Sequence, residues 1–146
     1  MKKTVLLVMI SFCFVLNGYS QQIEEKSVAT YCSSTLMEKI LDDKGITYES
    51  LSVNRYKIQL NGYNVLMNID DGDLFLHTFF TITNPSLNRM NDFNAQYRWG
   101  RAYIDSDGDL VYASELSFTG GIGVLGIHTF LNTYGQILDI LQSHMK

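Results

Sequence analysis

Residues 55–83 (RYKIQLNGYNVLMNIDDGDLFLHTFFTIT) decide the fold of this chain. Apolar and polar side chains alternate through three runs of this stretch, as is typical of strands that bury one face. Asn61-Gly62 separates the first two runs, and the sequence DDGD at 70–73 separates the second from the third. Asn-Gly is the strongest short-range signal for a β-hairpin. We therefore predict a three-strand antiparallel meander, because turns this short join antiparallel neighbours.

The third run, residues 74–83, differs from the other two because it is apolar on both faces. One face, which begins with Leu74, supplies the core. The other carries Phe75 and Phe79 with His77 between them. An exposed aromatic strip of this kind marks an interface, so we predict that Phe75, His77 and Phe79 form a protein-interaction face. We interpret His77 as a partly buried packing residue rather than a metal ligand.

Apolar residues at helical spacing predict a helix on each side of the meander. The first follows Lys26 and ends at Lys44, before the natural stop Gly45. Its buried stripe repeats every four residues: Val28, Cys32, Leu36 and Ile40. The second helix starts at Asn84-Pro85, where Asn84 can cap it and Pro85 suits the first helical position.

The remaining sequence predicts a hairpin and a last helix. Strands at about 98–105 and 110–118 flank a turn at 106–108, and an apolar stripe follows at 124–143. The order is therefore helix, three-strand antiparallel meander, helix, β-hairpin, helix. This order predicts an α+β domain with helices packed on a five-stranded sheet.

The first twenty residues have the anatomy of a secretory signal peptide. Two lysines precede an uncharged, mostly apolar run, and the segment ends in the small-x-small pattern Gly18-Tyr19-Ser20. The apolar run is too short to cross a bilayer core, which needs about 20 residues. We predict a signal peptide at 1–20 cleaved after Ser20, a disordered tail at 21–27, and one domain at 28–146. The location is then periplasmic or secreted, with no membrane span after cleavage.

Composition narrows the function classes. The chain has 11 basic and 15 acidic side chains, a net charge of −4, and removal of residues 1–20 takes away two lysines and leaves −6. This balance argues against a nucleic-acid partner. Cleavage also leaves a single cysteine, Cys32, which cannot form an internal disulfide. We predict a buried, inert thiol; an intermolecular disulfide or a reactive thiol stays open.

No spacing in the sequence matches a catalytic or cofactor-binding motif. It holds no GxSxG elbow, no HExxH pair and no P-loop, and the GxGxxG match at 121–126 belongs to no repeating βαβ unit. We therefore predict no enzyme activity, no metal ligands and no cofactor. The sequence DSDGD at 105–109 resembles a calcium loop, but Leu110 and Leu116 stand where such a loop needs Gly and Glu. A hairpin turn explains these residues better.

Four short segments carry a family resemblance: Asn91-Asp92-Phe93-Asn94, RWGRAYID at 98–105, DGDL at 107–110 and Gly120-Gly121-Ile122. Their order and spacing resemble the YbjN family, whose members are labelled bacterial sensory transduction regulators. The resemblance covers roughly residues 36–141. It implies a fold similar to that of type III secretion chaperones, which bind protein partners and often dimerise, and it implies no known catalytic residues. The leader sets this chain apart from members that look cytoplasmic.

We expect the family-motif residues to be mainly structural: Asn91, Asn94, Arg98, Arg101, Asp105, Gly120 and Gly121. Asn94 lies within the apolar stripe of its helix, and a buried amide must find partners. We expect it to tie the helix to a neighbouring loop or strand.

The sequence thus favours a non-enzymatic extracytoplasmic module that binds a protein or peptide, and we also expect a homodimer. The alternative is an envelope protein that binds calcium or a small ligand through the Asp-rich hairpin turn at 105–109.

Overall fold

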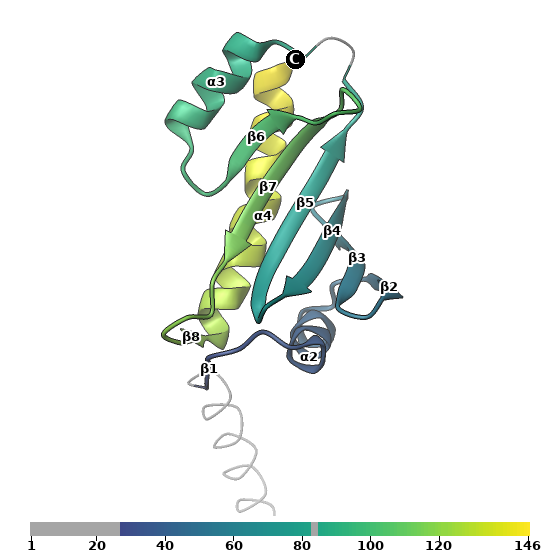
Figure 1. Ribbon diagram of the computed structural model, residues 1–146, viewed down its shortest axis with the longest axis vertical. Coiled ribbons are helices and arrows are strands. Elements are labelled where there is room, and N and C mark those ends of the chain that lie inside the picture. The colour runs from purple at the N-terminus through teal and green to yellow at the C-terminus, as the bar shows by residue number, and fades with distance from the viewer. Residues whose placement is uncertain (1–26, 83–84) are drawn as a thin grey trace, which may run out of the picture.

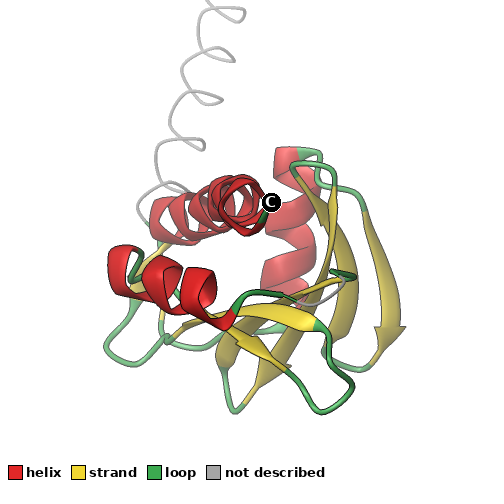
Figure 2. Cartoon of the chain, turned by 90° about the horizontal axis from the view of Figure 1, so that it is seen from above, coloured by secondary structure: helices red, strands yellow, loops and turns green. Residues whose placement is uncertain are grey.

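The computed structural model describes residues 27–82 and 85–146. These residues form an antiparallel sheet in the order β2-β3-β4-β5-β7-β6 (Figure 1). Figure 2 shows helices α2, α3 and α4 on the same side of this curved sheet. The strands are β2 (Tyr48–Ser52), β3 (Arg55–Leu60), β4 (Tyr63–Asp70), β5 (Asp73–Phe80), β6 (Arg101–Ile104) and β7 (Leu110–Leu116). The helices are α2 (Ser34–Lys44), α3 (Leu87–Gln96) and α4 (Val124–Met145).

The predicted meander is confirmed, with both of its turns. Asn61 and Gly62 have φ angles of 48° and 82°, and Asp71 and Gly72 have φ angles of 48° and 83°. Positive φ at both central residues is what a type I′ hairpin turn requires, and the twist of that turn matches the twist of the flanking strands. The α+β class and the antiparallel sheet are likewise confirmed.

The structure adds strands to the five that were predicted. The sheet has six strands rather than five, because Tyr48–Ser52 forms the edge strand β2 against β3. This strand is almost wholly exposed, so it shows no apolar alternation. A separate short pair joins β1 (Val28–Ala29) to β8 (Ile122–Gly123).

The first helix was predicted too long at its start. Val28 lies in β1 with 65% of its surface exposed, and α2 begins only at Ser34. Ser33 is its N-cap, because the Ser33 side chain accepts a hydrogen bond of 3.2 Å from the backbone N–H of Leu36. Residues 1–26, which hold the predicted leader and most of the predicted tail, lie outside the described residues. Ser27, assigned to that tail, already accepts a hydrogen bond from the backbone N–H of Val124.

Cys32 is buried, as predicted, although it precedes α2 instead of lying on it. Burial raises the pKa of its thiol to about 12, and the nearby Asp73 carboxylate adds to the shift. A thiol with so high a pKa stays protonated at neutral pH and is therefore a poor nucleophile.

The second helix starts at Leu87 with Ser86 as its N-cap, and not at Pro85. The predicted cap, Asn84, lies outside the described residues. Leu87 is exposed, while Met90 and Phe93 are buried. The last helix, α4, ends two residues later than predicted, at Met145.

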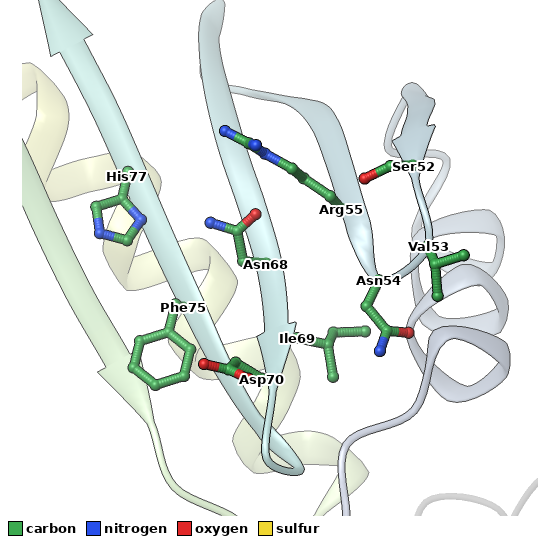
Figure 3. Close-up of a pocket in the computed structure, with 9 residues that line it drawn as sticks. All are labelled: Ser52, Val53, Asn54, Arg55, Asn68, Ile69, Asp70, Phe75 and His77. Carbon is green, nitrogen blue, oxygen red and sulfur yellow. The ribbon is translucent and has the colours of Figure 1, made fainter.

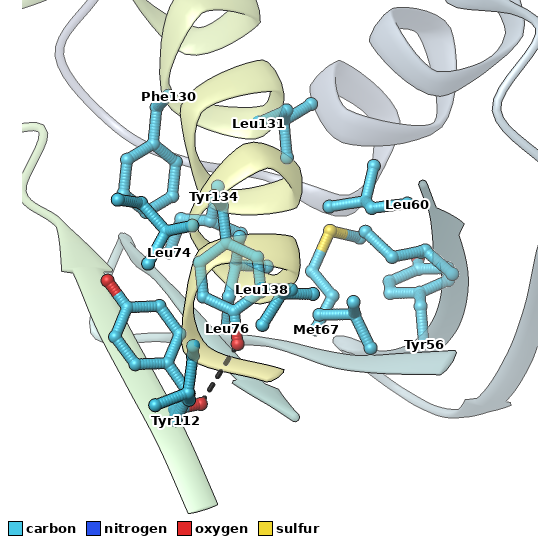
Figure 4. Close-up of a cluster of buried hydrophobic side chains, with 14 of the residues drawn as sticks. Tyr56, Leu60, Met67, Leu74, Leu76, Tyr112, Phe130, Leu131, Tyr134 and Leu138 are labelled. Atoms are coloured by element: carbon cyan, nitrogen blue, oxygen red, sulfur yellow. Dashed lines mark hydrogen bonds between the residues drawn. The ribbon is translucent and has the colours of Figure 1, made fainter. Parts of the chain in front are cut away.

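The long helix α4 packs against the centre of the sheet (Figure 4). The hydroxyl of Tyr134 donates a 2.9 Å hydrogen bond to the backbone carbonyl of Tyr112 on β7. Its oxygen also lies 3.0 Å from Oγ1 of Thr78 on β5. The single Tyr134 proton goes to the carbonyl, so Thr78 must donate to the Tyr134 oxygen. These buried hydrogen bonds fix α4 over β5 and β7. None of the helices in the described ranges combines the length and apolarity that crossing a bilayer requires.

Replacing Tyr134 by Phe tests this network. The change leaves the buried carbonyl of Tyr112 and the hydroxyl of Thr78 without their partner, so we expect the free energy of unfolding to fall by about 1–3 kcal/mol. Urea denaturation followed by circular dichroism measures it. Tyr31→Phe is the control, because Tyr31 is exposed and should unfold at the same urea concentration as the parent. Equal stability of both variants would show that the Tyr134 hydroxyl contributes nothing.

Candidate functional site

The face of the sheet opposite the helices carries the predicted interaction residues. The alternation of β5 buries Leu74, Leu76 and Thr78 beneath the helices, so its other side chains point the opposite way. Phe75 and His77 are half-buried on this outer face, and Phe79 is 52% exposed. The helices therefore do not cover the strip Phe75–His77–Phe79.

A first shallow depression lies on one side of this strip. It has a volume of about 520 Å³ and reaches from the β2–β3 turn to β5. Figure 3 shows how Arg55 of β3, Asn68 of β4 and the pair Phe75 and His77 of β5 lie along it, with α4 behind the sheet. Asp70 supplies the acidic group of this depression.

A second depression, of about 620 Å³, lies on the other side of the strip and shares Phe75 and His77 with the first. The segment 98–100 and strand β6 form its far wall. Its remaining side chains are aromatic or charged for the most part: Arg98, Trp99, Arg101, Tyr103 and Glu115. Phe75 and His77 thus stand between two hollows on the same face.

Strand register explains why residues distant in sequence meet here. His77 of β5 pairs with Ala113 of β7, and Ala113 pairs with Arg101 of β6. Side chains directly opposite one another in paired strands lie on the same face. Arg101 therefore lies two strands away from His77 in one row across the outer face.

Three contacts hold the segment between α3 and β6, which carries Arg98 and Trp99. The Asn94 amide donates to the carbonyl of Ala102 and accepts from the N–H of Ala102, both at 2.8 Å, which confirms the predicted tie between helix and strand. The Ser114 hydroxyl donates to the backbone carbonyl of Trp99. Gly100 lies so close to β7 that a Cβ there would be 2.7 Å from the Tyr112 hydroxyl.

The arginines of the outer face are not neutralised by carboxylates. Within residues 27–82 and 85–146, the ion pairs join Lys39 to Asp43 and Lys57 to Glu49, and none involves Arg55, Arg98 or Arg101. Burial lowers the pKa of His77, and the Arg55 charge lowers it further. Its Nδ1 is buried without a hydrogen-bond partner. Both effects favour the neutral imidazole, and the side chain of His77 is half-buried, in line with the prediction of a partly buried residue.

The structure separates the family-motif residues into two groups. Asp105 closes its hairpin turn, because its Oδ1 accepts from the N–H groups of Asp107 and Asp109 at 3.0 and 2.9 Å. Gly121 has a φ of 91°, and a Cβ there would lie 2.6 Å from Val28. Gly120 also has positive φ. By contrast, Arg98 and Arg101, which were expected to be structural, line the second depression. Asn91 is exposed on α3.

No group of three His, Cys, Asp or Glu side chains within the described part of the chain could hold a metal ion. The Asp105 oxygen at the calcium-like turn is occupied by backbone N–H groups, and the turn lies outside both depressions. This geometry favours the interpretation of residues 105–109 as a hairpin turn.

Sequence reasoning missed Arg55, Tyr103 and Glu115 as members of the outer face. Their alternation within β3, β6 and β7 could have placed them on one side, but only with the strand order known. Trp99 carried a clearer signal, because it is the single tryptophan of the chain and stands next to Arg98.

Exchanging Asn94 for Asp tests whether its amide holds this site together. The substitution keeps the shape but replaces the donor to the Ala102 carbonyl with an oxygen that repels it. We expect the free energy of unfolding to fall by about 1–3 kcal/mol, measured by urea denaturation, and the Trp99 emission maximum to move. Asn91→Asp, on the exposed side of the same helix, should change neither quantity. An Asn94→Asp protein as stable as the parent, with unchanged emission, would contradict the assignment.

Comparison with known proteins agrees with this architecture. The family model described as "Putative bacterial sensory transduction regulator", YbjN, matches residues 33–145. The crystal structure of YbjN from E. coli, described as "a putative transcription regulator", has a TM-score of 0.66 and 14% sequence identity; the match covers 79% of this chain and 91% of that chain. At this identity it shows a shared fold. Comparison with curated proteins gave no match. The matched region includes every helix described above, and the chain belongs to the YbjN family.

Proposed function

We propose that this protein is an extracytoplasmic, non-enzymatic regulatory module that binds a protein or peptide partner through the outer face of its sheet. One observation carries the proposal. The aromatic side chains Phe75, Phe79 and Trp99 lie on the face without helices, beside two depressions that share Phe75.

The energetics of these side chains support an interface. Phe79 is 52% exposed and Trp99 is 62% exposed. Covering the exposed half of an aromatic side chain removes roughly 100 Å² of apolar surface from water, which is worth about 2 kcal/mol. Tryptophan and arginine are also the residue types that most often dominate binding energy at interfaces. Arg98 and Arg101 stand beside Trp99 in the second depression.

Two further features support the regulatory and non-enzymatic parts of the proposal. The family is described as a regulator. Within the described residues, the two depressions contain one histidine, His77, whose Nδ1 is buried and whose pKa is lowered by burial. Both features support a module that acts through binding.

The extracytoplasmic location rests on the leader. Residues 1–20 combine a positive start, an apolar run and a small-x-small end. A leader of this kind directs the chain out of the cytoplasm, so the partner would be an envelope or secreted protein. A second copy of the chain is one such partner.

Site-specific photo-crosslinking in intact cells tests the proposal. We expect p-benzoylphenylalanine in place of Phe79 to form a covalent adduct with a protein partner, because its side chain would be covered in the complex. The same group in place of Leu125, which is exposed on α4, is the matched control and should give no adduct. Adducts are read on denaturing gels and by mass spectrometry.

The outcomes of this experiment test the homodimer, the cleavage of the leader and the binding face. An adduct of twice the chain mass identifies the homodimer. The mass of the recovered chain gives its first residue, which we expect to be Gln21. Adducts from Leu125 alone, or from neither position, would contradict binding through the outer face, and an intact leader in the recovered protein would contradict the proposed location.

A further inference from the structure

We infer that the partner presents an extended acidic segment to the outer face, with its carboxylates against Arg55, Arg98 and Arg101 and its apolar side chains against Phe75 and Phe79. This inference rests on the proposed function and specifies the chemistry of the partner at the same site.

The distribution of charge over the described residues singles out this face. These residues include eight basic and 13 acidic side chains. Three of the basic ones line the two depressions, whereas Asp70 and Glu115 are the two acidic ones that do so. Five basic and 11 acidic side chains remain elsewhere. The lining therefore carries a net charge of +1, whereas the other described residues carry a net charge of −6. An acidic segment is attracted to the lining and repelled by the rest of the surface.

The arginines here are available for carboxylates. None of the three forms an ion pair with another described residue, although Asp70 and Glu115 lie in the same depressions. A guanidinium group matches a carboxylate with two parallel hydrogen bonds, and such charge-assisted pairs are stronger than neutral ones. Arg98 and Arg101 flank Trp99, so a segment that pairs with either also contacts the indole ring.

The spacing of the arginines requires a segment rather than a small anion. Arg55 is on β3 and Arg101 is on β6, which are four strand spacings apart in the order β3-β4-β5-β7-β6. At about 4.8 Å per spacing the two strands are roughly 19 Å apart. An extended peptide advances about 3.3 Å per residue, so about six residues cross this distance. On the way the peptide passes over Phe75 and His77, which both depressions share.

Trp99 reports directly on occupancy, because it is the single tryptophan of the chain and lines the second depression. The probe is the peptide GEELEELEEG, and its charge-reversed control is GKKLKKLKKG. We expect Trp99 emission to change saturably with the acidic peptide and to stay constant with the lysine peptide. Added salt should weaken the binding, because the contacts are ion pairs.

Substitutions test which arginines contribute. We expect Arg101→Gln and Arg55→Gln each to weaken binding of GEELEELEEG by about tenfold, the loss of one charge-assisted pair. Arg89→Gln is the matched control, because Arg89 lies on α3 and lines neither depression, and it should bind like the parent. Circular dichroism confirms that each variant is folded.

Several results would overturn the inference. Equal responses to both peptides, or a loss of binding in Arg89→Gln, would contradict charge complementarity as the basis of binding. Binding that depends on Arg101 but not on Arg55 would contradict a peptide that crosses the sheet from β3 to β6. A Trp99 response to phosphatidylglycerol vesicles but not to GEELEELEEG would assign the face to a membrane surface. If GEELEELEEG fails while Phe79 still crosslinks to a protein, the acidic segment is wrong but the proposed function stands; if both fail, the proposed function fails too.

Discussion

A sheet that carries its helices on one face leaves the other face in water, and the architecture of this protein follows from that constraint. The Tyr134 hydroxyl fixes α4 to the centre of the sheet through Tyr112 and Thr78, and the main hydrophobic cluster packs between the helices and the sheet. Strand β5 must then serve two environments. Its buried face is apolar because it packs beneath α4. Its outer face is also aromatic, although these side chains do not belong to the core.

The edge of the sheet that lies near α3 extends this outer face. A single amide, that of Asn94, occupies both hydrogen-bonding groups of Ala102 on the edge strand β6. The preceding segment is then pressed against β7 at Gly100 and held at the Trp99 carbonyl by Ser114. The contacts of Asn94, Gly100 and Ser114 thus position the segment that carries Arg98 and Trp99, which line the second depression on the outer face. A family motif that is structural at Asn94 supplies, from four residues later, side chains that line the second depression.

Much of the fold could be predicted because its signals are local. Asn61-Gly62 and Asp71-Gly72 adopt the positive φ angles that their residue types favour, and the three strands around them alternate in the expected way. The place of β2 at the edge of the sheet was not predicted, because an exposed strand shows no apolar face. The start of α2 was misplaced because Val28 has helical spacing with Cys32 but pairs with Gly123, a partner 95 positions away.

The candidate site could be predicted only in part, for the same reason. Alternation within one strand placed Phe75, His77 and Phe79 on a common face. The position of Arg101 depends on β7 lying between β5 and β6. The pairing of β5 with β7 joins strands that α3 and β6 separate in the sequence, so no local pattern reveals it. Arg98 and Arg101 therefore read as structural in the sequence, although the structure brings them to the aromatic strip.

The proposed binding mode requires that the partner contacts the outer face of the sheet and not the helices. The most direct measurement is an amide NMR map of the protein, with and without the partner recovered through Phe79. The proposed binding mode predicts shifted resonances in β3, β4, β5 and β7 and in the segment 97–101, with the exposed sides of α3 and α4 unchanged. Shifts confined to the exposed sides of α3 and α4 would contradict it, because the partner would then sit on the helix layer.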